Sequence, residues 1–236
     1  MTRPYEACNY IDFDGRKYLY LNDDSPVMGY QTKDISFVAQ PLPYSSEDYN
    51  VIPVPLMMTD EWEIIQSNPT LISELRTISG CKQTHTFNFI GQTGYVGREI
   101  FRNLDIEDYV FVETGTVYSL DKEDKRNKLI KFLYEIASSI FTFAPRGIGS
   151  SSFRAYQAMM VGSIPIITGM NDYPFKDEVN WDEICIRGDL KDINTLIEKA
   201  LNMTWEERKT MRGRMMLFWD NYCKHDSLYN KLKEKV

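Results

Sequence analysis

The chain has 236 residues, of which 43% are hydrophobic and 26% charged, and its formal net charge is −7. This length is enough for one large domain or two small ones with a buried core. The negative charge disfavours nucleic acid as a partner, because neutralising a phosphate backbone requires a basic surface. With only two histidines in the sequence, a histidine-rich metal centre is excluded.

Four cysteines are present, and no two of them have C-x-x-C spacing: Cys8, Cys81, Cys185 and Cys223. The spacing indicates neither a disulfide framework nor a zinc site, so reduced thiols are the simplest expectation. No apolar run approaches the roughly 18 residues that span a bilayer, and no signal peptide opens the chain. We therefore expect no membrane segment and a cytoplasmic location.

The N-terminal part contains short strand-like pieces at 17–21, 35–40 and 49–56. Asp14 and Gly15 precede the first of them, and this Asp-Gly pair predicts a hairpin turn. A helix is predicted at 69–79, with Gly80 ending it.

From His85 onward, strand-like and helical segments alternate. Strands are predicted at 86–90, 109–114, 140–144, 163–168 and 183–188, and helices at 96–104, 122–139, 152–161 and 190–202. This alternation predicts an α/β domain with a parallel, doubly wound sheet covered by helices on both faces. The apolar stripe of the last helix consists of Leu190, Ile193, Ile197 and Leu201. A capping box of Thr204 and Glu207 predicts the start of one more long helix.

A glycine- and serine-rich loop with two arginines follows the strand at 140–144. Its glycines, serines and arginines are Arg146, Gly147, Gly149, Ser150, Ser151, Ser152 and Arg154. Parallel sheets bind ligands at the carboxyl ends of their strands, where this loop lies. The glycines allow a ligand to approach closely, amides at a helix start attract anions, and arginine binds phosphate bidentately. The loop therefore predicts a diphosphate site.

Two other interpretations of this loop remain open. Its serines could merely cap the helix while its arginines are solvated. A dinucleotide-binding loop would need a third glycine in place of Ser152 and an acid at the end of the next strand, where none occurs before Asp172. The glycines of "GQTGYVG" at 91–97 also have the wrong spacing for a Walker or Rossmann loop, but this piece ends a strand and opens a helix carrying Arg98.

A series of short pieces follows in order after residue 143. They are "PRG" at 145–147, "SFR" at 152–154, "AMMVGSIPI" at 158–166, "PF" at 174–175 and "VNW" at 179–181. This series resembles the exostosin-type glycosyltransferases. Weaker similarity upstream, in "NVIPVPL" and "FNFIGQTGYVGREIFRNL", extends the resemblance to about residues 50–215. It implies a GT-B fold, whose C-terminal Rossmann-like half binds a nucleotide-sugar, usually a UDP-sugar.

The resemblance assigns roles by position. Arg98 and Arg154 would meet the diphosphate and stabilise UDP as it leaves. Arg146 and Gly147 would form the floor of a uracil–ribose pocket, and Tyr173 would stack on the sugar or cover it. The complete donor pocket implied in this way consists of Gly91, Arg98, Arg146, Gly147, Ser150, Ser151, Ser152, Arg154, Gln157 and Tyr173.

Several of these positions have alternatives or depart from the family. Arg98 could be a surface helix arginine, and Tyr173 could pack against Phe175. Phe175 and Trp181 are predicted to be core residues, because large aromatic side chains usually pack. Gln157 stands where the family usually has a carboxylate that accepts hydrogen bonds from ribose. A neutral amide there would weaken the ribose contact or change the nucleotide preference.

The N-terminal part is short for a GT-B enzyme, whose acceptor domain is normally a full Rossmann-like unit. We predict a reduced acceptor-side region at 1–80 and a nucleotide-sugar-binding domain at 81–203. A C-terminal helix at 204–236 is predicted to pack back towards the N-terminal region. Either the acceptor side is minimal or the chain is a piece of a longer protein.

The catalytic base of an inverting enzyme normally comes from the acceptor side, and with so few histidines it should be a carboxylate. The candidates are Asp12, Asp14, Asp23, Asp24, Asp34 and Asp60. Asp23 and Asp24 in "NDDSP" are favoured, although aspartate is also typical of turns. The piece "DFD" at 12–14 matches the D-x-D metal signature of the other glycosyltransferase fold, but the following Gly15 makes a hairpin turn the better interpretation. We expect no metal site.

The sequence thus predicts a glycosyltransferase that moves a hexosyl or pentosyl group from a UDP-sugar to a carbohydrate hydroxyl. The family resemblance suggests inversion at the anomeric carbon. The expected partners are a nucleotide-sugar donor and a glycan or glycoconjugate acceptor, with no required cofactor. The alternatives are a non-catalytic nucleotide-sugar-binding module and, less favoured, an NAD(P)-dependent oxidoreductase.

Overall fold

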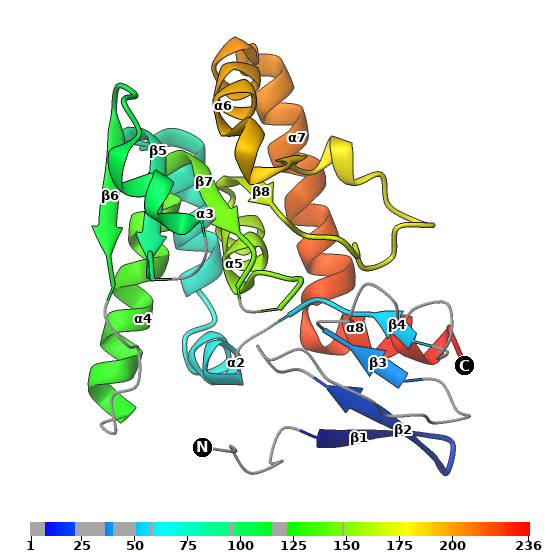
Figure 1. Cartoon of the computed structure of the whole chain (residues 1–236). Helices are drawn as coiled ribbons and strands as arrows, with labels where there is room; N and C mark the ends of the chain where they lie inside the picture. Colours follow the sequence, from blue (N-terminus) through cyan, green and yellow to red (C-terminus); the bar gives the residue numbers. More distant parts are fainter. Residues whose placement is uncertain are drawn as a thin grey trace.

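The structure, a computed structural model, contains two β-sheets flanked by helices (Figure 1). It describes residues 8–21, 36–39, 51–56, 59–94, 97–114, 122–147 and 149–236. The larger sheet comes from residues 85–188, and most of the helices come from the second half of the chain. The smaller sheet comes from the first 53 residues. This mixed architecture with a parallel, helix-flanked sheet confirms the predicted α/β class.

The smaller sheet consists of β1 (Cys8–Phe13), β2 (Arg16–Leu21), β3 (Ser36–Val38) and β4 (Val51–Pro53). Its first two strands form an antiparallel hairpin, and the other neighbours pair in parallel. The predicted turn is confirmed, because Asp14 and Gly15 have φ angles of 54° and 86°. The Gly15 amide donates to Asp12 Oδ1 at 2.8 Å. The last strand ends at Pro53, before the predicted end at residue 56, since the proline at position 55 has no amide to donate to a ladder.

The larger sheet has the order β6-β5-β7-β8-β9, and all its strands are parallel. The strands are β5 (His85–Gly91), β6 (Tyr109–Glu113), β7 (Ser139–Pro145), β8 (Ile164–Thr168) and β9 (Ile186–Gly188). Its central strands are almost completely buried, as expected for a sheet covered on both faces. The last strand begins later than predicted, because residues 181–183 form a short 3-10 helix whose start is capped by the Asn180 side chain.

The α-helices are α2 (Thr59–Ser67), α3 (Leu71–Cys81), α4 (Lys122–Ala137), α5 (Phe153–Val161), α6 (Ile193–Asn202), α7 (Trp205–Phe218) and α8 (His225–Lys233). The 3-10 helices are η1 (Arg98–Asn103), η2 (Trp181–Glu183) and η3 (Leu190–Asp192), and η4 (Trp219–Cys223) is a π-helix. The predicted capping box of Thr204 and Glu207 is confirmed at the start of α7. The predicted apolar stripe of α6 is wrong at its C-terminal end, since Leu201 is 51% exposed. Ala200 is buried instead, together with Leu196.

The C-terminal helices contact both sheets, and Figure 1 shows α7 running from the larger sheet down to α8 beside the smaller one. Arg76 on α3 forms a bidentate ion pair with Asp220, with N–O distances of 2.9 and 3.0 Å. On the other side, the Tyr229 hydroxyl donates to the Asp12 carbonyl at 3.0 Å, and Lys233 pairs with Asp14 at 3.0 Å. The division of the chain into three regions stays a prediction.

Gly80 does not end α3 as predicted, because the helix continues to Cys81. A Cβ atom on Gly80 would lie 3.2 Å from the guanidinium of Arg212, which reaches across from α7. That guanidinium donates to the Ser79 hydroxyl and to the Gly162 carbonyl. Glycine inside this helix therefore makes room for a contact between helices instead of marking a helix end.

We expect Gly162→Ala to destabilise the protein by about 2 kcal/mol. Gly162 ends α5 with a φ of 92°, and its added Cβ would collide with Ser79 Oγ and lie 3.0 Å from Arg212 Nε. Urea denaturation measures the loss. Gly213→Ala is the matched control, because Gly213 lies inside α7 with nothing within 4 Å of an added Cβ. An equal loss in both variants would contradict the argument.

Candidate active site

The candidate site lies at the carboxyl ends of β5 and β7, which are neighbours in the larger sheet. Gly91 ends β5 and Pro145 ends β7. The first strand leads through its loop into η1, and the second leads into α5. Because the two strands are parallel, both glycine-containing loops open at the same edge, where α/β sheets bind ligands.

Arg154, in the first turn of α5, has the most unusual environment at this edge. Its guanidinium lies over the rings of Phe89 and Phe132, with distances of 5.2 and 5.8 Å to their centroids. Its Nε is shielded from solvent, and within the described residues Arg154 makes no hydrogen bond or ion pair. Burial, with a further contribution from the positive charge of Arg98, lowers the pKa of Arg154 to about 9. A buried cation is costly unless it is paired with an anion, and no described residue supplies one here.

Gly91 provides the space that the Arg154 guanidinium occupies. A Cβ on Gly91 would lie 2.9 Å from Arg154 Nη1 and 3.0 Å from its Cζ, and closer still to Nη2. Gly91 is outside the left-handed region of φ, so backbone conformation does not require a glycine here. The close approach of the arginine does.

Arg98 is the first residue of η1, and its side chain is turned into the protein. It is only 8% exposed, so the alternative of a surface helix arginine is wrong. Its guanidinium donates to the carbonyl oxygens of Gln92 at 3.3 Å, Pro145 at 3.1 Å and Arg146 at 2.6 Å. Arg98 is near enough for its charge to lower the pKa of Arg154, but its described hydrogen bonds go to backbone. Contact between Arg98 and a diphosphate stays a prediction.

The serine-rich loop is compact and packed at the start of α5. Ser150, Ser151 and Ser152 are all buried. The Gly147 amide donates to the Ser151 carbonyl at 3.0 Å, which closes the loop on itself. Ser152 is the N-cap residue, yet its side chain makes no capping hydrogen bond. Simple helix capping by the Ser152 hydroxyl therefore does not account for this residue.

The remaining predicted pocket residues are Arg146, Gln157 and Tyr173. The exposed side chain of Arg146 runs beside Gly169, where an added Cβ would lie 3.0 Å from its Cδ. Gln157 is buried within α5. Tyr173, after β8, is half-buried, and burial raises its pKa to about 12. Its ring packs against Trp181 with a centroid distance of 4.8 Å.

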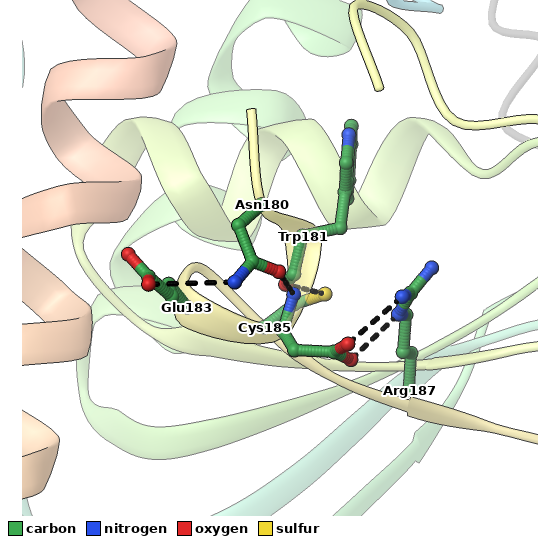
Figure 2. A network of polar contacts seen from close by, with 6 residues as sticks. Asn180, Trp181, Glu183, Cys185 and Arg187 are labelled. Atoms are coloured by element: carbon green, nitrogen blue, oxygen red, sulfur yellow. Dashed lines mark hydrogen bonds and ion pairs between the residues drawn. The ribbon is translucent and has the colours of Figure 1, made fainter. Parts of the chain in front are cut away.

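A network of polar contacts fixes the segment after β8 (Figure 2). Arg187 forms a bidentate ion pair with Asp182 at 2.7 and 2.9 Å, and its guanidinium lies 4.6 Å from the Tyr173 ring centroid. The Trp181 indole donates to the Pro174 carbonyl at 3.0 Å. Trp181 and Phe175 are both buried, which confirms the prediction that they are core residues.

An open hollow of about 370 Å³ lies beside this segment, lined by residues 176–181 and Arg187. It shares no residue with the predicted donor pocket. We place the candidate site at Arg154 instead, because the features suited to binding an anion lie there. They are the unpaired cation, the glycine-containing loops and the carboxyl ends of the strands.

The chain matches the Exostosin GT47 domain over residues 43–203. It belongs to this family. Among curated proteins, no significant match to the chain is found. Membership identifies the protein as a glycosyltransferase in general, and the Rossmann-type parallel sheet agrees with a GT-B-like fold. Within the described residues, no helix is both long and apolar enough to cross a membrane.

The predicted candidates for the catalytic base either lie outside the described residues or take part in the N-terminal hairpin. Asp23, Asp24 and Asp34 lie outside them, as does the side chain of Asp60. Asp12 accepts the Gly15 amide, and Asp14 pairs with Lys233, so both serve the hairpin and its contact with α8. Within the described part of the chain, no group of three or more His, Cys, Asp or Glu residues could hold a metal ion.

Three residues that sequence analysis did not single out hold the loop after β5. The Thr93 hydroxyl donates to the Glu113 carboxylate, and Arg102 donates to Thr93 Oγ1 at 2.8 Å and pairs with the same carboxylate. Hydrogen bonds from Thr93 and Arg102 lower the pKa of Glu113. The register of β5 and β6 would have indicated this contact, because it pairs Glu113 with Gly91 at the start of the loop.

Proposed function

We propose that this glycosyltransferase moves a sugar from a UDP-sugar to a hydroxyl group of a carbohydrate acceptor, with inversion at the anomeric carbon, in glycan biosynthesis. The observation that carries the proposal is Arg154, a desolvated cation without an anionic partner in the described residues, at the ligand-binding edge of the sheet. A diphosphate supplies the charge that this position lacks.

The sugar leaves UDP as negative charge develops on the β-phosphate. Arg154 would donate hydrogen bonds to that phosphate, and they strengthen as the bond to the sugar breaks. The aromatic rings beneath the guanidinium and the gap at Gly91 hold it in place before the donor arrives. The amides of residues 150–152 at the start of α5 would add the positive end of the helix dipole. Because guanidinium groups supply the charge, the proposal requires no metal ion and no cofactor.

Inversion requires a single in-line displacement. The acceptor oxygen forms a bond to the anomeric carbon while the bond from that carbon to UDP breaks, and the acceptor proton passes to a carboxylate base. Asp23 or Asp24 remains the proposed base. The other pocket residues, Arg146, Gly147 and Tyr173, would bind the nucleoside and the sugar.

One observation favours a second candidate, a nucleotide-sugar-binding module without catalysis. Gln157 is buried in α5 where the resemblance leads us to expect a carboxylate. A neutral amide accepts a ribose hydrogen bond without charge assistance. The donor would then bind without being held in the geometry for transfer.

The experiment combines binding with turnover. UDP is expected to raise the melting temperature of the protein, while NAD leaves it unchanged. A panel of UDP-sugars is then assayed for UDP release, with and without oligosaccharide acceptors. Release with at least one donor supports the enzyme, and its dependence on the acceptor supports transfer. Binding without release from any donor would leave the binding module, and no response to any uridine nucleotide would refute both.

A further inference from the structure

The positive charge of Arg98 acts on Arg154, but the two side chains have different surroundings. Arg154 has no hydrogen-bond partner within the described residues, whereas the Arg98 guanidinium is engaged with backbone carbonyls. These carbonyls belong to two separate loops. Gln92 follows β5, while Pro145 and Arg146 lie at the end of β7. Arg98 therefore joins the two loops that frame the candidate site.

A second arginine of η1, the 3-10 helix that carries Arg98, also contacts the loop after β5. Arg102, four residues further along η1, donates to Thr93 Oγ1 and pairs with Glu113. The loop after β5 is thus held from one side by Arg98, through the Gln92 carbonyl, and from the other by Arg102.

We propose that Arg98 is a positioning residue, which ties the loop after β5 to the loop after β7 and leaves direct contact with the diphosphate to Arg154. This inference rests on the proposed function. To reach a phosphate, Arg98 would have to give up hydrogen bonds to carbonyls in a site where it is 8% exposed. A buried carbonyl that loses its hydrogen-bond donor, and has no water to replace it, costs free energy. Arg98 keeps its position, and its charge adds to the positive potential at Arg154.

Lysine substitutions separate the two roles. Lysine keeps the charge, but its single ammonium group cannot span carbonyls from two loops. Arg98→Lys is therefore expected to weaken UDP binding at least about tenfold, close to the loss in Arg98→Gln. Arg154→Lys should bind UDP better than Arg154→Gln, because a phosphate contact needs charge. Isothermal titration calorimetry with UDP measures all four. Arg126→Lys, on the exposed face of α4, is the matched control and should bind like the wild type.

A measurement on the wild-type protein does not depend on the UDP affinity of a variant. In ¹⁵N spectra of arginine side chains, the Arg98 Nε signal should stay in place when UDP is added, because Nε already donates to the Arg146 carbonyl at 3.2 Å. The Arg154 Nε signal should move. The Arg98 and Arg154 variants assign the two signals.

The outcomes distinguish this inference from the proposed function. If UDP moves both signals equally, or if Arg98→Lys binds UDP within about threefold of the wild type while Arg98→Gln does not, Arg98 contacts the diphosphate and the inference is wrong. If UDP changes neither the spectrum nor the melting temperature, the proposed function fails and the inference fails with it.

Discussion

Replacing Arg154 with methionine is expected to weaken UDP binding about 100-fold, equivalent to about 2.8 kcal/mol, because charged hydrogen bonds to the diphosphate are lost. The same change should stabilise the ligand-free protein by about 1 kcal/mol, because an unpaired cation is removed from a desolvated place over Phe89 and Phe132. Calorimetry with UDP and urea denaturation without it measure the two effects. This opposite pair of effects is expected of a ligand-binding residue and not of a structural one.

Arg208→Met provides the matched control. Arg208 also has a shielded Nε without a partner in the described residues, and its guanidinium lies 5.4 Å from the Phe141 ring centroid. It belongs to α7, however, and contacts the Leu201 carbonyl, not the strand ends. The control should leave UDP affinity unchanged. If Arg154→Met binds UDP like the wild type, or if both variants lose affinity equally, Arg154 is not the diphosphate contact.

Local sequence patterns predicted much of the architecture, because they determine local structure directly. The Asp14–Gly15 turn and the Thr204 capping box depend on side chains within a few residues, and both were confirmed. The parallel sheet followed from alternating periodicity. Gly80 shows the limit of such patterns. A glycine after a helical stretch usually predicts its end, but this one makes room for Arg212, a contact 132 residues away that no local pattern contains.

The site divides in the same way. The family resemblance identified Arg98 and Arg154 together and gave them the same role. What separates them is long-range: the carbonyls around Arg98 come from two strand ends that are about 50 residues apart in the chain, and the gap for Arg154 comes from Gly91. The Thr93 and Glu113 contact depends on the pairing of β5 with β6. Sequence can place such residues at one edge of a sheet, but it cannot say which of them meet.

Gly91→Ala should weaken UDP binding roughly 10- to 100-fold with little change in the free energy of unfolding. The added methyl group would occupy the space of the Arg154 guanidinium, which must then leave its position over the Phe89 ring. Since the displaced atoms are the end of a flexible side chain and the backbone conformation suits alanine, the cost in stability should stay below about 1 kcal/mol. Gly94→Ala is the matched control, because an added Cβ there meets nothing within 4 Å.

A double-mutant cycle tests whether Gly91 acts through Arg154. In the Arg154→Met background, where the guanidinium is already gone, Gly91→Ala should change UDP affinity by less than about twofold. An undiminished loss in that background would mean that the methyl group blocks the ligand itself, and would place the diphosphate directly against the end of β5. A loss in the Gly94→Ala control as large as that in Gly91→Ala would instead show that the whole loop tolerates no added volume. If Gly91 acts by leaving space for the Arg154 guanidinium, one pattern of UDP affinities is expected. Gly91→Ala lowers the affinity strongly, Gly94→Ala leaves it unchanged, and Gly91→Ala has no further effect once Arg154 has been replaced.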